Sequence, residues 1–340
     1  MQINNRAVRY SGNYLLILDQ TLLPNQIRYL RLYNYHEIIE AIKKLRIRGA
    51  PLIGIVAAYG LALESKRKSP DIRTYLLKVA SEIKAARPTA VNLSWAIERL
   101  VKIINNPAIS DPKLSSALIS EAQVIDKEEC SHSHKIGQFG AKLIKNNYTI
   151  LTICNTGWLA TPGIGTALAV VYNAFQQSKK IKVYVPETRP LLQGARLTAF
   201  ELSLAKIPYI LITDSMISSV MRNIDIVLVG ADRIAGNGDT ANKIGTLTLA
   251  IIAKYYNVPF YVVAPLSSFD MTKRTGKEII IEERNKNEII YIHNQQIAPK
   301  TANVYNPAFD ITPHKLISGI ITNKGIIKPP FRTNIRRCFK

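Results

Sequence analysis

Two side chains that could act as an acid, a base or a nucleophile stand at the ends of predicted strands, and one of them is Asp232. The apolar, β-branched run 226–229 is typical of a buried strand, and it stops at Gly230. Asp232 therefore follows the carboxyl end of a predicted parallel strand, where open α/β sheets bind their ligands. Taken alone, an Asp at a strand end is more often a helix cap or a solvated loop residue.

The loop after Asp232 is too polar and too rich in glycine for an ordinary connection, and the next helical pattern opens at Ala241. We therefore expect Asn242 and Lys243 at a helix N-terminus. Backbone amides and the helix dipole favour anions at such a position. The alternative is a capped surface loop.

The other reactive side chain is Cys154, at the end of the predicted strand 148–154. A cysteine at a strand end is more often a small buried apolar residue than a reactive thiol. The polar residues 155–157 beside it favour a functional role. If the strands run in the usual order 3-2-1-4-5, the strands that lead to Cys154 and Asp232 are neighbours. The sequence then predicts a thiol and a carboxyl group in one crevice.

Two arginines stand at helix junctions in the N-terminal half. Arg48 precedes Gly49 and Ala50, whose amides are predicted to lie near a helix N-terminus. Arg87 stands at a second junction, ahead of Pro88. A guanidinium beside helix N-terminal amides suits a phosphate group. Each junction alone is more often a capped turn with a surface arginine.

The polar stretch 187–196, which contains Gln193, follows the predicted strand 181–185. It fits either a salt-bridged helix start or one wall of a ligand site. Glu187 could bind the ribose of a dinucleotide, as in a dehydrogenase. The glycine pattern does not support that function, because Leu168 stands where the dinucleotide motif needs a third glycine or alanine.

The spacing of apolar residues divides the chain into two predicted domains and indicates an α/β fold. Residues 6–33 alternate and predict a small antiparallel β meander; the N-terminal domain, 1–145, is otherwise helical. The second domain, 146–340, is predicted to be Rossmann-like, with a doubly wound parallel sheet. The predicted helices of the first domain are 36–46, 52–66, 70–85, 91–104 and 111–145. The second alternates strands 148–154, 181–185, 209–212, 225–229 and 259–263 with helices 164–177, 191–205, 215–222 and 243–256, and further short strands are expected in EIIIEE (278–283) and EIIYI (288–292).

The composition is that of a globular protein, with 47% hydrophobic residues in 340. The chain has no uninterrupted apolar run of the roughly 18 residues that a membrane span needs, and its first residues lack the apolar core of a signal peptide. We therefore expect a cytoplasmic enzyme that does not bind membranes. The three cysteines and five histidines show no metal-ligand or disulfide spacing, so no metal is expected.

The net charge of +21 is large and could attract either an anionic small molecule or nucleic acid. The basic residues are dispersed along the chain, and aromatic residues do not alternate with them as a base-stacking surface requires. A small anionic substrate is therefore favoured over nucleic acid.

Six uncommon motifs occur in an order that resembles the methylthioribose-1-phosphate isomerases. These enzymes share a superfamily with ribose-1,5-bisphosphate isomerase and with the regulatory subunits of translation initiation factor 2B. The resemblance extends to NPAFDITPHKLISGIIT at 306–322. Its motifs are RGAP at 48–51, ARPTAVNL at 86–93, TICNTG at 152–157, PETRPLLQGARLTAFEL at 186–202, LITDSM at 211–216 and VGADRIAGNGDTANKIGT at 229–246.

The resemblance implies a homodimeric enzyme of methionine salvage that needs no nucleotide, metal or other cofactor. It implies that Cys154 and Asp232 are the catalytic pair. The positions that match the family's substrate-binding residues are Arg48, Gly49, Ala50, Arg87, Gln193, Asn242 and Lys243. Two positions depart from the family pattern, Ile153 and Trp158, and the second could reshape the pocket.

Two alternatives to this function stay open at the level of sequence. One is the sister activity on ribose 1,5-bisphosphate, which requires a second phosphate site. The other is a regulatory subunit without catalysis, which would be expected to lack the Cys and Asp pair that this chain has.

Overall fold

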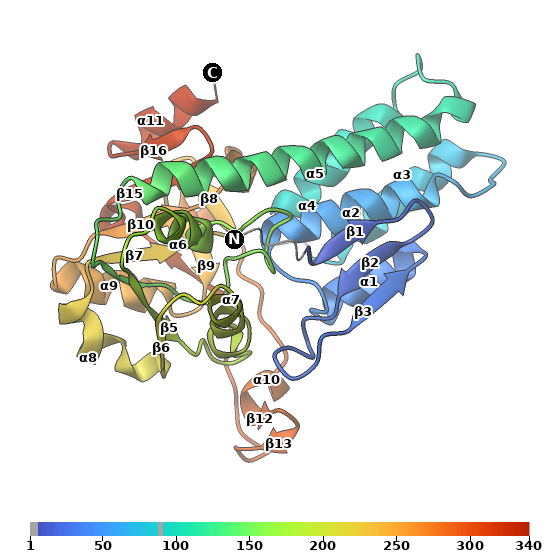
Figure 1. The fold of residues 1–340 in the computed structure, drawn as a ribbon. Helices are drawn as coiled ribbons and strands as arrows, with labels where there is room; N and C mark the ends of the chain where they lie inside the picture. The colour runs from blue at the N-terminus through green and yellow to red at the C-terminus, as the bar shows by residue number, and fades with distance from the viewer. Residues whose placement is uncertain (1–5, 88–90, 340) are drawn as a thin grey trace. The chain divides into compact units, whose positions relative to one another are not determined.

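The computed structural model describes residues 6–87 and 91–339, and these residues form two compact units (Figure 1). The N-terminal unit contains the described residues up to 134 together with 158–165. The C-terminal unit contains residues 135–157 and 166–339.

The N-terminal unit begins with the predicted meander. Its three antiparallel strands are β1 (Val8–Tyr10), β2 (Leu15–Leu18) and β3 (Tyr29–Leu32), in that order across the sheet. Five helices follow, within a few residues of the predicted ranges: α1 (Tyr35–Lys43), α2 (Ala50–Glu64), α3 (Ile72–Ala85), α4 (Val91–Ile104) and α5 (Asp111–Ala141). Helix α5 ends four residues before the predicted end.

Helix α2 is the centre of this unit, because all of its residues are buried. A helix that is apolar on every side must be surrounded by other elements. Its last residue, Glu64, ties two neighbouring helices to it. The Glu64 carboxylate accepts hydrogen bonds from the Tyr35 amide (2.9 Å) in α1 and the Tyr75 hydroxyl (2.6 Å) in α3, and it pairs with Arg67.

The C-terminal unit is built on a sheet with the order β16-β15-β10-β7-β4-β5-β6, parallel except for β16 (Figure 1). The five predicted strands of this domain take the predicted order 3-2-1-4-5 within it, and the predicted α/β fold is confirmed. The strands are β4 (Thr149–Leu151), β5 (Lys182–Pro186), β6 (Tyr209–Ile212), β7 (Ile226–Val229), β10 (Phe260–Val263), β15 (Gly319–Thr322) and β16 (Gly325–Ile327).

Helices that connect these strands cover the sheet and bury its apolar side chains. One core cluster joins Val227, Val229 and Phe260 of the sheet to Leu249 of α9 and Phe331 of α11. Each large apolar side chain buried in this way contributes about 1.5–3 kcal/mol. The helical elements are α6 (Ala167–Gln176), the π-helical turn η1 (Gly194–Thr198), α7 (Ala199–Leu204), η2 (Asp214–Met216), α8 (Ile217–Val220), η3 (Met221–Asn223), α9 (Thr246–Tyr255), η4 (Leu266–Ser268), η6 (His314–Leu316) and α11 (Phe331–Cys338).

A second sheet in the C-terminal unit, with the order β11-β8-β9-β14, was not predicted. Its strands are β8 (Arg233–Ala235), β9 (Thr240–Lys243), β11 (Phe269–Asp270) and β14 (Phe309–Thr312). The prediction that Asn242 and Lys243 open a helix is therefore wrong. Both lie in β9, which pairs with β8 on one side and β14 on the other, and the helix begins at Thr246.

The prediction of strands in EIIIEE and EIIYI is also largely wrong. Residues 278–283 contain the end of the 3-10 turn η5 (Gly276–Glu278) and one isolated bridge, Glu283 to Pro307. Residues 288–292 are divided between α10 (Asn287–Ile290) and β12 (Tyr291–Ile292), which pairs with β13 (Gln295–Gln296). Short apolar runs do not by themselves distinguish a strand from a helical turn.

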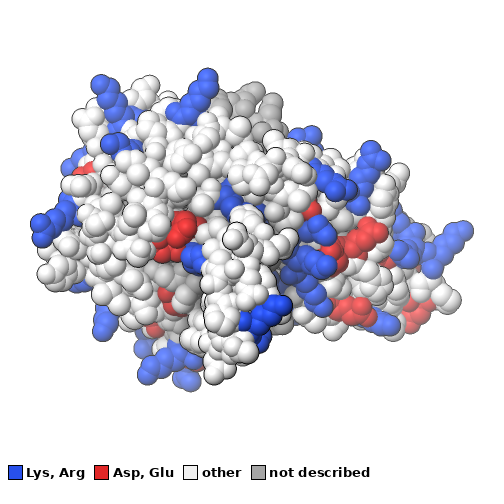
Figure 2. Space-filling model, turned by 90° about the horizontal axis from the view of Figure 1, so that it is seen from below, with Lys and Arg blue, Asp and Glu red and all other residues white. Residues whose placement is uncertain are grey.

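On the face of the molecule in Figure 2, Lys and Arg side chains are spread among neutral residues, with Asp and Glu between some of them. This agrees with the dispersal of basic residues along the sequence. Within the described residues, no helix is both long and apolar enough to cross a membrane.

Replacing Glu64 by alanine should destabilise the N-terminal unit, because it leaves the buried amide of Tyr35 and the half-buried hydroxyl of Tyr75 without their acceptor. We expect the free energy of unfolding, measured by urea titration, to fall by about 2–4 kcal/mol. The matched control is Glu98→Ala, because Glu98 is 60% exposed and pairs with Lys84 at the surface. That change should cost less than about 1 kcal/mol. Equal losses in the two variants would contradict the role of Glu64.

Candidate active site

Cys154 follows β4 closely and has an unusual backbone conformation. Its φ angle is 61°, in the left-handed region, which costs a non-glycine residue about 1–2 kcal/mol. Two hydroxyl groups hold it there. The Cys154 amide donates to Thr188 Oγ1 (2.9 Å), and the Cys154 carbonyl accepts from Thr198 Oγ1 (2.6 Å). The thiol thus belongs to a buried residue whose backbone is fixed on both sides.

Asp232 lies between β7 and β8 and is half-buried. Its amide donates to the carbonyl of Ala241 in β9 (2.9 Å). Strand β7 is hydrogen-bonded to β4, with Leu151 opposite Val227. The prediction that the strands leading to Cys154 and Asp232 are neighbours is therefore confirmed.

The loops after these two strands come together at Gly230. A β-carbon added to Gly230 would lie 2.8 Å from Thr156 Cγ2 and 3.9 Å from Asn242 Oδ1. The first distance is shorter than real β-carbons show, so glycine is needed for the approach. The segments that carry Cys154, Asp232 and Asn242 therefore meet at one edge of the main sheet.

Several buried polar atoms have no hydrogen-bond partner among residues 6–87 and 91–339, and two of them belong to the polar stretches 155–157 and 187–196. They are Gln193 Oε1, on a side chain that is 6% exposed, and Thr156 Oγ1. Buried polar groups normally have a partner, because burial without one costs about 1–3 kcal/mol. A ligand with several hydroxyl groups would supply the missing donors.

Asn242 and Lys243 are both buried in β9. The side-chain amide of Asn242 donates through Nδ2 to Thr246 Oγ1 (3.1 Å), at the first turn of α9. Lys243 Nζ donates to the carbonyl of Ala308 (2.9 Å) and lies 4.9 Å from the centre of the Phe309 ring, a cation–π distance.

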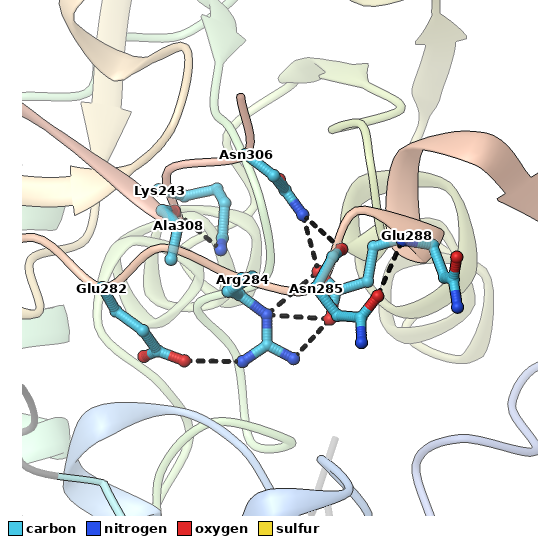
Figure 3. A network of polar contacts seen from close by, with 8 residues as sticks. Lys243, Glu282, Arg284, Asn285, Glu288, Asn306 and Ala308 are labelled. Carbon is cyan, nitrogen blue, oxygen red and sulfur yellow. Dashed lines mark hydrogen bonds and ion pairs between the residues drawn. The ribbon is translucent and has the colours of Figure 1, made fainter. Parts of the chain in front are cut away.

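The segment that carries the Ala308 carbonyl is fixed by a network around Arg284 (Figure 3). Arg284 lies between Glu282 (2.8 Å) and Glu288 (2.5 Å). The Asn306 side chain donates to the Asn285 carbonyl (3.0 Å), and the Ala308 amide donates to the Glu282 carbonyl (2.8 Å). These contacts fix the position of the Ala308 carbonyl, which accepts the hydrogen bond from Lys243.

The N-terminus of α9 already has an anion of its own. The Asp310 carboxylate, in β14 opposite Asn242, accepts hydrogen bonds from the amides of Gly245 (2.8 Å) and Leu247 (3.0 Å). Burial raises the pKa of Asp310 to about 6, although these bonds and the charge of Lys243 oppose the rise. The helix-end anion site that the sequence predicted here is thus occupied by a carboxylate of the chain itself.

The other predicted site residues lie in the N-terminal unit. Gly49 caps α2 with a φ of 95°, and a β-carbon there would lie 2.5 Å from the Ala160 backbone. The predicted helix junction is present, because α2 begins at Ala50, and Arg48 and Ala50 are both buried rather than at the surface. Arg87 follows α3 and is half-buried. The rest of the predicted junction, Pro88 and Thr89, lies outside the described residues.

Several polar residues of this edge were not predicted from the sequence. Thr188 and Thr198 stabilise the Cys154 backbone, and Asp310 caps α9. Thr188 also depends on Asp214, which accepts its amide hydrogen bond (2.8 Å). All of them lie within the motifs quoted above, but each contact joins segments that are distant in the sequence, so no local pattern indicated these roles.

A parallel sheet with this strand order and with polar loops at its carboxyl edge defines a Rossmann-like α/β protein, and proteins of this class bind their ligands at that edge. Comparison with known proteins agrees. A family model described as the initiation factor 2 subunit family matches residues 46–329. A methylthioribose-1-phosphate isomerase of Acetivibrio thermocellus is 49% identical over 98% of this chain and 99% of its own. One of Dehalococcoides mccartyi is 51% identical over 95% and 99%.

Two solved structures are similar over nearly their whole length. The 5-methylthioribose 1-phosphate isomerase of Pyrococcus horikoshii has a TM-score of 0.87 and 40% identity, covering 99% of this chain and 96% of that one. A chain named translation initiation factor eIF-2B, subunit delta, from A. fulgidus has a TM-score of 0.84 and 42% identity, with 98% of each chain covered. The chain belongs to the initiation factor 2 subunit family and, within it, to the group of the methylthioribose-1-phosphate isomerases. The resemblance inferred from the six motifs is confirmed.

Replacing Asp310 by asparagine should change how stability depends on pH. The pKa of Asp310 is about 6 in the folded chain and about 3.9 when unfolded, so the folded chain binds more protons between these values. The free energy of unfolding of the wild type should therefore fall, relative to Asp310→Asn, as the pH rises from about 4 to about 6. The change is at most about 3 kcal/mol. Urea unfolding at pH 4.5 and pH 7 tests this, and a difference independent of pH would refute it.

Proposed function

We propose that this chain converts 5-methylthioribose 1-phosphate into 5-methylthioribulose 1-phosphate, an aldose to ketose isomerisation in methionine salvage. Relatives with that name are 49% and 51% identical to it over nearly their whole length. The observation that carries the proposal is that Cys154 and Asp232 follow neighbouring parallel strands of this fold. A carboxyl group can supply the acid and base steps of this reaction, and a thiol can transfer the hydrogen or provide an apolar wall.

The chemistry assigns Asp232 the acid and base steps. The phosphate ester blocks the anomeric oxygen, so the sugar ring cannot open to a free aldehyde. Asp232 donates a proton to the ring oxygen, and the bond between C1 and that oxygen breaks. As a carboxylate, Asp232 then takes the proton of the C2 hydroxyl as the ketone forms, which returns it to its starting state.

The hydrogen on C2 must also reach C1, and two routes are open. In one, the Cys154 thiolate removes the proton from C2, an enol forms, and the thiol returns the proton to C1. In the other, the hydrogen moves directly from C2 to C1 as a hydride, and Cys154 provides an apolar wall. Substrate deuterated at C2 distinguishes the routes, because direct transfer retains the deuterium at C1 in water.

Seven residues are proposed to bind the substrate. Gln193, whose carbonyl oxygen has no partner among the described residues, is suited to a sugar hydroxyl. Asn242 and Lys243 bring an amide and a charge to the edge of the sheet. Arg48, Gly49, Ala50 and Arg87 of the N-terminal unit are proposed to bind the phosphate through a guanidinium and helix N-terminal amides.

We further propose that the enzyme is a cytoplasmic homodimer that needs no metal or nucleotide. The sister reaction on ribose 1,5-bisphosphate is the main competing function. A regulatory role in translation is the other, since one similar structure carries the name of an initiation factor subunit. Cys154 and Asp232 favour catalysis, because a regulatory subunit has no use for such a pair.

Product analysis by NMR tests the function directly. Purified protein is given methylthioribose 1-phosphate and ribose 1,5-bisphosphate in competition. We expect the ketose 1-phosphate of the methylthio sugar to form faster. Preferred turnover of the bisphosphate, or turnover of neither compound, would refute the proposed substrate.

Cys154→Ser and Asp232→Asn should each lower kcat by roughly 100-fold or more, because each removes a group that moves a proton or shapes the transition state. Both side chains keep nearly the same size, so the thermal unfolding temperature should change little. Circular dichroism and steady-state kinetics on the same preparations check both points. Activity near the wild-type level in either folded variant would remove that residue from the mechanism.

Gln193→Leu should raise KM, because it replaces the unpartnered carbonyl oxygen with apolar atoms of similar volume. Loss of one hydrogen bond to a substrate hydroxyl corresponds to roughly a 3- to 10-fold change in kcat/KM. The control is Gln176→Leu, at the end of α6. An unchanged kcat/KM in Gln193→Leu would place the substrate elsewhere.

A further inference from the structure

A buried carboxyl group that the proposed mechanism does not use lies against the Cys154 loop. Glu201 is in α7 and is 1% exposed. Its Oε1 accepts a hydrogen bond from Asn155 Nδ2 (2.8 Å), and its Oε2 accepts one from the Tyr172 hydroxyl (2.7 Å). A carboxylate is costly to bury even when it is hydrogen-bonded, so an apolar residue would serve better if packing were the only need.

Glu201 also packs against the backbone of the loop that follows Cys154. A β-carbon added to Gly157 would lie 1.8 Å from Glu201 Oε2. The loop after Cys154 therefore contacts the same carboxyl group twice, through a hydrogen bond at Asn155 and through direct backbone packing at Gly157.

A chain of hydrogen bonds leads from Glu201 to the Cys154 backbone. Asn155 Nδ2 also donates to Thr198 Oγ1 (3.3 Å), and Thr198 Oγ1 donates to the Cys154 carbonyl (2.6 Å). A carboxylate can only accept, so Asn155 must turn its amino group toward Glu201 and Thr198. The hydroxyl of Thr198 then accepts from Asn155, and its single proton is available for Cys154. The Cys154 carbonyl can also only accept, so the acceptors at the two ends of the chain together fix the direction of each bond.

We propose that Glu201 is a positioning residue for Cys154. Its carboxyl group accepts the hydrogen bond from Asn155 and so orients Asn155 and Thr198, and these hold the left-handed backbone from which the thiol projects. The inference rests on the proposed role of Cys154 in the reaction. It adds a requirement for a carboxyl acceptor at a position that is not among the proposed substrate-binding residues.

The sharpest test is Glu201→Gln, which keeps the shape of the side chain and adds donor hydrogens. If the new amino group faces Asn155, Asn155 must turn its oxygen toward it, and that oxygen then competes with the Cys154 carbonyl for the proton of Thr198. We expect kcat to fall roughly 10- to 100-fold while KM stays within about twofold, since misplacement of a reacting group acts on turnover. Thermal unfolding confirms that the variant is folded at the assay temperature.

A second readout does not depend on activity. The rate at which iodoacetamide alkylates Cys154, followed by mass spectrometry of the peptide across a range of pH, should change by at least about threefold in Glu201→Gln. Cys130 in the same molecules should keep its wild-type rate, because it lies in the N-terminal unit on α5. This readout stands even if Cys154→Ser proves active and the proposed mechanism fails.

The matched control is Tyr172→Phe, which removes the other hydrogen bond to the same carboxyl group and leaves the chain to Cys154 intact. We expect its kcat to stay within about twofold of the wild type. If Glu201→Gln does not fold, Asn155→Ala breaks the same chain and should give the same loss of kcat and the same change in alkylation. The proposal is overturned if the folded variants keep both the wild-type kcat and the wild-type alkylation of Cys154, or if Tyr172→Phe loses as much activity.

Discussion

The left-handed backbone at Cys154 is the constraint on which the arrangement of the site depends. A non-glycine residue adopts this conformation only where its surroundings impose it. Here Thr188, after β5, and Thr198, in η1, bond the two sides of the residue. Thr188 is fixed in turn by Asp214, whose carboxylate accepts the amides of Thr188 and Arg189. The conformation of Cys154 thus depends on segments that follow three strands, β4, β5 and β6.

The second sheet extends this edge beyond what the main sheet alone provides. The chain leaves β7 at Gly230 and turns directly into β8, so Asp232 lies where the two sheets meet. Strand β9 returns beside it and brings Asn242 and Lys243, and β14 adds Asp310 on the far side. The amide and the ammonium group therefore come from strand β9, and the Asp232 carboxyl group comes from the short connection between β7 and β8.

The main sheet could be predicted from the sequence because its strands are apolar, β-branched runs that alternate with helices. A parallel sheet buried on both faces requires such runs, and the usual strand order then places Cys154 and Asp232 on neighbouring strands. The strand 226–229 is the clearest case. The motifs indicated the family. The resemblance in turn implied substrate-binding roles for Gln193, Arg48 and Arg87, which the spacing of residues alone left open.

The second sheet could not be predicted, because its strands have no pattern of their own. Thr240–Lys243 is polar and short, and it is a strand because β8 and β14 supply its hydrogen bonds. Those partners lie up to about 70 residues away, so a local window contains no sign of them. The same holds for Asp310 and Glu201, whose roles follow from contacts across the fold.

The position of Asp310 changes how an anion could be bound at this edge. The sequence suggested that the N-terminus of α9 would offer its free amides to a phosphate, but two of these amides donate to Asp310. A second anion at the same helix end would meet the repulsion of that carboxylate whenever it is ionised. The positive charge of Lys243 lowers the pKa of Asp310, so Lys243 already interacts with a carboxyl group of the chain itself. An anion at this edge would therefore need hydrogen bonds from side chains such as Asn242, and the amides at the start of α2, after Gly49, stay the proposed place for a phosphate.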